Sequence, residues 1–342
     1  MDSLSIFNFI YTLLCLKKDK MQKQGNGYVY NDYSKKMPDL KFEYDSKHVP
    51  NSDDLPDPQQ DPVIPGSRVP LRKVGIAPVD LPIIVKRREG GVQQLQAQAS
   101  LYCSLDDVNA KGLNLSRLYL LMHDKIKDHL TVDGIKDALK ELAEKQGSKH
   151  AYCKLRFKYP WTQDALRSKN DYGTKLRGHI AYDTEVEGQY HDGSYKFFLK
   201  LKYVYSSTCP CSFELAHDAT EKRGQAANAH SQRSILTIKI EFPVDRVVWI
   251  EDLVELCRKH IPTEVQIVVK RIDEQAFAEL NGSNLLFSED VCRIMHQALS
   301  EWDNQGRISD FSIAVSHEES LHPWNAIAVT SKHDSAIGQV LD

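Results

Sequence analysis

SYKFFLKLKYVYS, residues 194–206, alternates apolar and polar side chains along almost its whole length. One face carries five large apolar or aromatic side chains: Phe197, Leu199, Leu201, Tyr203 and Tyr205. The opposite face carries three lysines, Lys196, Lys200 and Lys202, and is interrupted by Phe198 and Val204. This alternation is typical of a strand in an antiparallel sheet that is buried on one side. The stretch therefore predicts a sheet with one covered face.

Similar patterns lie on both sides of this strand. Strand character is found in residues 92–105, 152–159, 176–187, 234–242, 264–270 and 308–316. Apolar residues at helical spacing predict helices from Ser116 onward and in residues 132–144, 249–260 and 287–302. Residues 213–228 read as a long polar loop. The order strand, strand, helix, helix, strand, strand thus occurs twice, as a repeat of pattern and not of sequence identity.

This order predicts an α+β protein of two tandem ββααββ modules, with antiparallel sheets and helices on one face. We place an irregular N-terminal extension at residues 1–66, because residues 48–68 are rich in proline. The first module is assigned to residues 67–190 and the second to residues 191–342. A sheet covered on one face leaves its other face or its edges exposed, so we expect an oligomer.

Composition limits the class of protein. The formal net charge of -3 over 342 residues favours no general binding of nucleic acid. Seven scattered cysteines do not fit the disulfide framework of a secreted domain, and we expect a cytoplasmic protein. The apolar residues 4–16 fall short of the ~20 residues that a membrane helix needs, and their flanking charges do not suit a signal peptide. We expect no membrane partner.

The strand of residues 194–206 leads into a Cys-Pro-Cys segment, residues 209–211, which lies among serines and a threonine. One intervening residue suits a structural zinc site poorly, because such sites use pairs like C-x2-C. Buried, inert thiols in a turn are the alternative interpretation. The polar neighbours favour a reactive thiolate, so we predict that one of these cysteines takes part in chemistry.

Two later segments supply further polar groups. His230 lies in AHSQRS, residues 229–234, and Glu319 and His322 lie in ESLHPW, residues 319–324. Each of these is a weak signal alone, since surface histidines are common. The acidic residues of RIDE, 271–274, and FSED, 287–290, are explained as well by helix capping. Together with the cysteines, the histidines and acidic residues of these segments support a metal-assisted active site. They leave its reaction open.

In their order, these motifs resemble the GTP cyclohydrolase family of type IB, the prokaryotic form of the tunnelling fold. The resemblance runs from about Arg72 to Thr330. Its motifs are RKVGI (72–76), KGLNLSR (111–117), RFKYP (156–160), CPCS (209–212), HSQRS (230–234), KRIDE (270–274), SEDV (288–291) and ESLHP (319–323). The family implies an oligomeric barrel, expected to be a homotetramer with sites at subunit interfaces. It also implies conversion of GTP and water to 7,8-dihydroneopterin triphosphate and formate, a step of folate, pterin and queuosine-type biosynthesis.

The resemblance also implies site residues. The metal ligands would be Cys209, His230, Glu274 and Glu319, around a divalent zinc, manganese or ferrous ion. The metal would polarise a water for attack at C8 of guanine, with Cys209 helping to set that centre and His322 transferring protons. Glu289 would hold the guanine edge. The candidates for binding the triphosphate are Ser116, Arg117, Lys202 and Arg233.

The chain departs from the family pattern at several places. Asn114 stands where the family usually has a histidine, and Trp324 stands where another histidine is common. Residues 213–228 are longer than the family leads us to expect, and His217 within them could compete as a ligand. Two rivals stay open: a non-catalytic purine- or pterin-binding scaffold, and the NADPH-dependent nitrile reductase of queuosine synthesis.

Overall fold

A computed structural model describes residues 45–51, 54–56, 59 and 63–333. The apolar stretch 4–16 lies outside these residues. The chain divides into two units, one formed by residues up to Val69 together with Val108–Gly112. Within that unit, Arg68 Nη1 donates a hydrogen bond to Asn109 Oδ1 at 2.9 Å. The second unit contains all the strands and helices named below.

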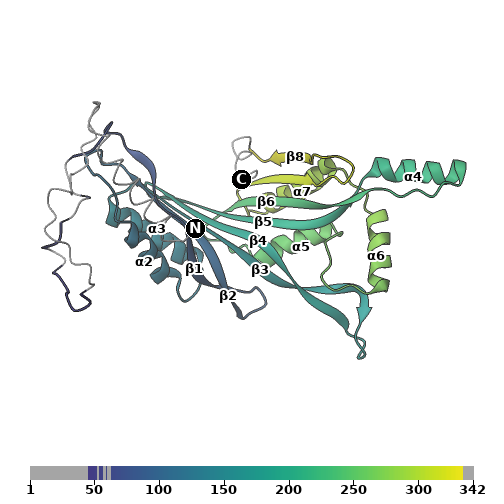
Figure 1. Ribbon diagram of the computed structural model, residues 1–342, viewed down its shortest axis with the longest axis horizontal. Coiled ribbons are helices and arrows are strands. Elements are labelled where there is room, and N and C mark those ends of the chain that lie inside the picture. Colours follow the sequence, from purple (N-terminus) through teal and green to yellow (C-terminus); the bar gives the residue numbers. More distant parts are fainter. Residues whose placement is uncertain (1–44, 52–53, 57–58, 60–62, 334–342) are drawn as a thin grey trace, which may run out of the picture. The chain divides into compact units, whose positions relative to one another are not determined.

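One eight-stranded antiparallel sheet forms the second unit, with its strands in sequence order (Figure 1). The strands are β1 (Leu71–Lys86), β2 (Val92–Leu105), β3 (His150–Lys169), β4 (Lys175–His191), β5 (Ser194–Thr208), β6 (Ser231–Phe242), β7 (Asp310–His317) and β8 (Ala326–Ser331). The sheet runs without a break across the predicted boundary between residues 190 and 191, because β4 and β5 are paired. Within the described strands, β1 and β8 are its two edges.

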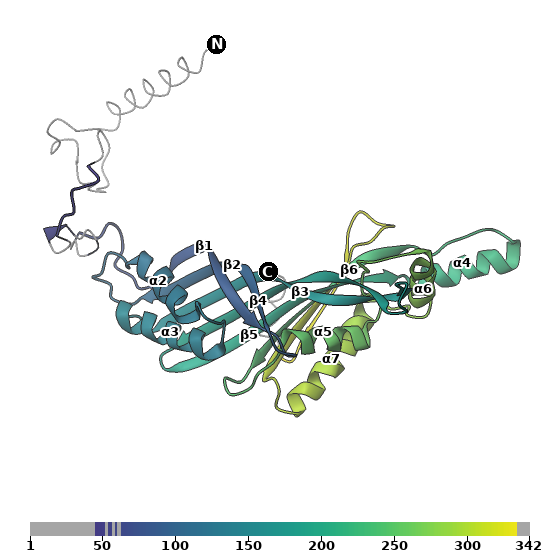
Figure 2. The same cartoon turned by 90° about the horizontal axis from the view of Figure 1, so that it is seen from below.

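Six helices accompany the sheet among the described residues. They are α2 (Leu115–Ile126), α3 (Val132–Gln146), α4 (Pro210–Arg223), α5 (Ile250–His260), α6 (Arg271–Gly282) and α7 (Ser288–Asn304). Helices α2 and α3 contact the strands of the first half, and α5 and α7 contact those of the second (Figure 2). Both pairs cover the same face, while α4 and α6 lie at the end of the sheet. The α+β class with a largely one-sided helix layer is confirmed.

The alternation in β5 determines which face the helices cover. Phe197, Leu201 and Tyr203 are fully buried, and Tyr203 Oη donates to the carbonyl of Ile261, just after α5. The lysines project from the opposite face, where Lys202 is exposed. Lys200 on that face is buried, and this burial lowers its pKa. One period-2 pattern therefore separates an apolar core from a charged sheet surface.

Close packing of helix on sheet explains one glycine. At Gly188 in β4, an added Cβ would lie 2.6 Å from Ile135 Cγ2 and 3.0 Å from Leu139 Cδ1, both on α3. These distances are too short for real carbon contacts, so a larger residue would push α3 away from the strand. Glycine at this position lets the first helical pair approach the sheet.

Two expectations from sequence are wrong. Residues 213–228 are not simply a loop, because α4 occupies the segment as far as Arg223. Residues 264–270 are not a strand, since Glu264 alone forms an isolated bridge, to Tyr205. The Glu264 carboxylate instead accepts hydrogen bonds from Gln163 and Arg258, and the apolar residues Ile267 and Val269 of this segment are exposed. The second half thus contains α4 and α6 in addition to the expected ββααββ pattern.

No helix within the described ranges is both long and apolar enough to cross a bilayer.

Candidate active site

Cys209 lies where β5 ends and α4 begins. It occupies the N-cap position of α4 in an extended conformation, followed by Pro210 in the first turn, where a missing N–H costs little. Its side chain is half-buried, and that of Cys211 is exposed. The Cys209 backbone N–H donates to the carbonyl of His230 at 3.3 Å. The strand end therefore holds Cys209 beside the segment that enters β6.

His230 and Glu319 meet at the same end of the sheet. His230 Nδ1 lies 3.0 Å from Gln232 Oε1 and 3.7 Å from Glu319 Oε2. Both side chains are largely buried, with exposures of 18% for His230 and 11% for Glu319. Strand β6 runs between β5 and β7, and Ser234 pairs with Tyr205 on one side and His317 on the other. This register brings three segments that are distant in sequence to one place.

Gln232 is a site residue that the sequence analysis missed. Its Nε2 donates to Ser207 Oγ at 2.8 Å and to Glu319 Oε1 at 3.5 Å, while its Oε1 faces His230. An Nδ1–H on His230 donates to that oxygen and leaves Nε2 of the imidazole as a free lone pair. Gln232 follows His230 by two positions, so strand periodicity is the signal that could have identified it.

His317 and Glu289 lie on neighbouring elements. His317 Nε2 is 2.8 Å from Tyr205 Oη, and burial lowers the His317 pKa to about 4. Glu289, exposed in the first turn of α7, counteracts that shift slightly through its negative charge. Its own backbone N–H and a 2.9 Å hydrogen bond from Ser288 Oγ lower the pKa of Glu289. Glu289 is therefore an ionised acceptor at neutral pH.

Several predicted site residues lie elsewhere. Glu274 is exposed on α6, and His322 is exposed between β7 and β8, where its ring stacks on Trp324 at 4.1 Å. Arg233 is exposed on β6. Lys202 lines a groove of about 590 Å³ on the helix-free face of the sheet.

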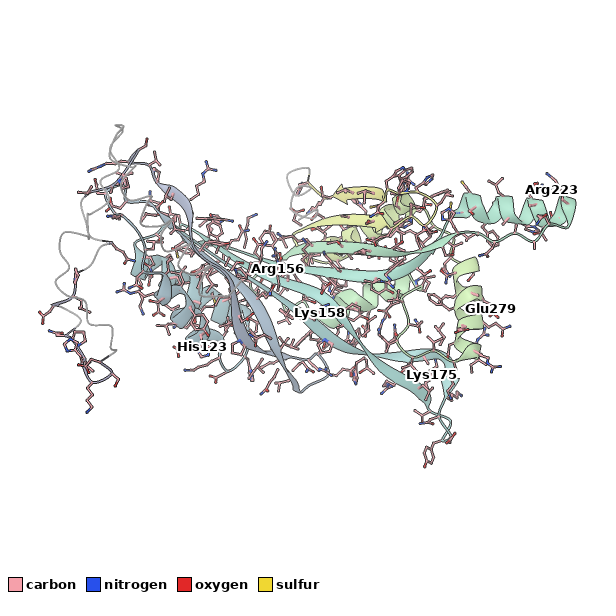
Figure 3. All side chains as sticks on the ribbon, in the orientation of Figure 1. His123, Arg156, Lys158, Lys175, Arg223 and Glu279 are labelled. Atoms are coloured by element: carbon pink, nitrogen blue, oxygen red, sulfur yellow. The ribbon has the colours of Figure 1, made fainter. Side chains whose placement is uncertain are left out.

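Ser116 and Arg117 begin α2, which lies at the opposite end of the sheet from α4. Figure 3 labels His123 on α2 and Arg223 on α4 and shows the same separation. Arg156 and Lys158, labelled between them, lie on β3 in the middle of the sheet. One chain therefore does not gather all the predicted residues.

The chemistry of the gathered residues suits a divalent transition metal. Cys209, His230 and Glu319 offer sulfur, nitrogen and oxygen donors, a mixture found around zinc and ferrous iron. Across the described ranges, however, no three His, Cys, Asp or Glu side chains are close enough to hold one ion. Within the described part of one chain, these residues therefore do not form a complete metal site.

The chain is similar in sequence to a known protein family. The family model described as type I GTP cyclohydrolase FolE2 matches residues 55–328. The chain belongs to this family. A GTP cyclohydrolase FolE2 from Dinoroseobacter shibae is 39% identical over 294 residues, covering 85% of this chain and 77% of that protein. FolE2 of Paracoccus denitrificans is 38% identical over 290 residues, covering 84% and 87%.

A solved structure of lower similarity is uricase from Arthrobacter globiformis. It has a TM-score of 0.43 and 8% identity to this FolE2 family member, covering 76% of this chain and 92% of the uricase chain.

Asn114 stands where the resemblance leads us to expect a histidine. It has a local role at the start of α2. It occupies the N-cap position of α2, and its Oδ1 accepts a 2.8 Å hydrogen bond from Ser116 Oγ. Its carbonyl accepts a bond from Gln146 Nε2 at 3.1 Å, which joins the start of α2 to the end of α3. The Asn114 side chain therefore orients the Ser116 hydroxyl, and the backbone carbonyl of the same residue links the two helices.

Proposed function

We propose that this protein is a GTP cyclohydrolase that converts GTP and water to 7,8-dihydroneopterin triphosphate and formate, the first step of folate and pterin biosynthesis. The single observation that carries the proposal is the pairing of His230 with Glu319 beside the Cys209 strand end, within the segment 55–328 matched to the family. We place the enzyme in the cytoplasm, where free thiols such as those of Cys209 and Cys211 persist.

A divalent metal suits the proposed reaction. Cys209, His230 and Glu319 would hold it, with Glu274 as a further ligand. When bound, such an ion lowers the pKa of a water molecule from about 15.7 toward neutrality and supplies a nucleophile at neutral pH. Gln232 would orient the imidazole of His230 through Nδ1, as outer-shell partners of metal ligands commonly do.

The chain's own polar residues have separate tasks. Glu289 accepts hydrogen bonds from the guanine ring N–H and exocyclic amine, which its ionised state favours. His322 transfers protons during opening of the imidazole ring, and its exposed loop position gives it access to a bound nucleotide. Ser116, Arg117, Lys202 and Arg233 would contact the triphosphate.

An oligomer would complete the site. Ser116 and Arg117 lie at the start of α2, at one end of the sheet, and Cys209 lies at the start of α4, at the other end, so a neighbouring chain must supply part of each site. The edge strands β1 and β8 are free to extend the ladder into another copy. We therefore propose a homotetramer of the tunnelling-fold type, a closed barrel with interfacial sites.

The test is anaerobic incubation of the metal-stripped full chain with GTP, adding manganese, zinc or ferrous ion separately. Formate and the fluorescence of the oxidised pterin are both measured. Metal-dependent release of both products is expected. Intact GTP binding without either product, under every metal, would overturn the proposal and favour the non-catalytic scaffold.

Replacing Gln232 by alanine should weaken metal binding about 10- to 100-fold, the usual effect of losing an outer-shell partner. Its carboxamide contacts both His230 and Glu319, so its loss frees both side chains. The measurement is the ion concentration that gives half-maximal formate release. Gln225→Ala, on the exposed loop after α4, is the matched control and should behave as wild type. Equal metal dependence in both variants would contradict the assigned role.

Replacing Glu289 by glutamine should raise KM for GTP about tenfold. Glutamine keeps one oxygen acceptor but loses the charge, and hydrogen bonds to charged groups contribute about 1.5–3 kcal/mol. Steady-state kinetics with GTP measures the effect. Glu301→Gln makes the same change at an exposed position of α7 and should leave KM unchanged. A shift shared by both variants would show that Glu289 does not contact the substrate.

A further inference from the structure

Two histidines face each other at the other end of the sheet. His150 begins β3 and His191 ends β4, and the two are register partners. Their Nδ1 atoms are 3.1 Å apart, and their ring centroids are 5.0 Å apart. Both side chains are half-buried.

The backbone explains this close approach. The Asp192 N–H donates to the Lys149 carbonyl at 2.9 Å, just beyond the strand ends, and the His150 N–H donates to Ser104 Oγ at 3.1 Å instead of to β4. The neighbouring pair, His150 and His191, is then a non-hydrogen-bonded pair, in which side chains approach more closely. The fold thus sets the separation of the two imidazoles, independently of any ligand.

A chain of polar contacts fixes the tautomer of His191. Lys239 Nζ donates to Glu187 Oε2 at 2.9 Å, and Gln189 Nε2 donates to Glu187 Oε1 at 2.6 Å. The remaining Gln189 Oε1 lies 3.1 Å from His191 Nε2, which must therefore carry the proton. The lone pair of His191 Nδ1 then points at His150. This is the arrangement by which outer-shell groups orient a metal-binding histidine.

We propose that His150 and His191 form a second metal site, which binds a borderline divalent transition ion such as Ni²⁺, Cu²⁺ or Zn²⁺ through the Nδ1 atoms of both rings. Binding moves the proton of His150 from Nδ1 to Nε2 without a change of charge. Water completes the coordination shell. The proposal is independent of the proposed cyclohydrolase activity, because neither His150 nor His191 is among the residues assigned to that site.

The spacing of the pair suits an ion. With metal–nitrogen bonds of about 2.0–2.1 Å, nitrogens 3.1 Å apart subtend about 100° at the metal, between octahedral and tetrahedral angles. Imidazole pairs select these borderline ions over calcium or magnesium, which prefer oxygen.

The surrounding charges set the affinity. Lys73 and Lys196 act on His191 and disfavour a cation, whereas Asp106 acts on His150 and favours one. Two protein ligands among mixed charges point to a moderate affinity that competing chelators of known strength can measure. A bound ion would join the start of β3 to the end of β4.

The test counts bound Ni²⁺ per chain by equilibrium dialysis of the metal-stripped full protein against a competing chelator. Wild type is expected to bind one ion more than His150→Gln and His191→Gln. His150→Gln leaves the Gln189–His191 contact in place. Loss of the bound ion in this variant would therefore not be explained by misfolding around His191. His179→Gln, at an exposed position of β4, is the matched control and should bind as wild type.

GTP turnover with saturating metal distinguishes the two sites. The His150 and His191 variants are expected to lose one bound ion and to keep formate release. The second site would be overturned if wild type and both variants bound the same number of Ni²⁺ ions, with affinities within twofold. That result would leave the pair as a hydrogen-bonded contact of the ladder.

Discussion

Replacing Cys209 by alanine is expected to lower formate release from GTP more than about 100-fold. Losing an outer-shell partner commonly costs 10- to 100-fold, and losing a proposed ligand should cost more. The fold should persist, because Cys209 is half-buried and its thiol makes no capping hydrogen bond within the described part of α4. Turnover and circular dichroism of the same preparation test both parts of the expectation.

Cys211→Ala is the control for this experiment. It removes a second thiol two residues away, at an exposed position in the first turn of α4. We expect Cys211→Ala to keep most of its activity. A fully active Cys209→Ala enzyme would remove Cys209 from the site, and equal losses in both variants would show a requirement for the segment and not for one sulfur.

Replacing Asp273 by alanine is expected to destabilise the protein by roughly 3 kcal/mol, since each buried group left unpaired costs about 1–3 kcal/mol. The Asp273 carboxylate is 1% exposed and accepts hydrogen bonds from the backbone N–H groups of Arg167, Ser168 and Lys270. It also accepts one from Ser168 Oγ. These contacts attach α6 to β3. Urea denaturation followed by tryptophan fluorescence measures the loss.

Glu279→Ala is the matched control on the same helix. Its ion pair with Arg167 is exposed, so the expected change is at most about 0.5 kcal/mol. Equal destabilisation by the two substitutions would show that α6 is held by its surface and not by Asp273.

The contribution of the Asp273 carboxylate to stability should depend on pH. Burial alone would raise the pKa of Asp273, but hydrogen bonds from Ser168 and three backbone N–H groups outweigh it and hold the pKa well below its usual range. A carboxyl whose pKa is lower in the folded state than in the unfolded state stabilises the fold at pH values above the unfolded-state pKa of about 3.9. This stabilisation is lost as the pH falls toward the folded-state pKa. The stability difference between wild type and Asp273→Asn should be full at pH 7 and shrink below about pH 4.

Strands and amphipathic helices of this protein are predictable because burial of one face makes apolar residues recur at a regular spacing in the sequence. The predicted strand 92–105 coincides with β2, and the predicted helix 249–260 begins one residue before α5. Helix α4 was missed because it buries none of its described residues and so has no apolar stripe. Pro210 in its first turn and Gly224 at its left-handed C-cap were the local signals that could have revealed it.

The site was less predictable than the fold. Spacing cannot bring His230 to Glu319 across 89 positions of sequence, because the register of β6 against β7 does so. The sequence indicated the residue types of the proposed metal site, and the resemblance implied their roles. Gln232 was missed because its residue type suggests no chemistry, and its spacing of two positions from His230 was the only signal that pointed to it.

The sequential order of the strands has a consequence for synthesis on the ribosome. Every strand pairs with a neighbour in sequence, so the ladder can lengthen from β1 onward while later residues are still being made. Strands β7 and β8, with the segment carrying Glu319 between them, join this growing sheet last. A nascent chain that ends before residue 319 can therefore display most of its core to quality-control factors while lacking one of the four ligands proposed for the metal.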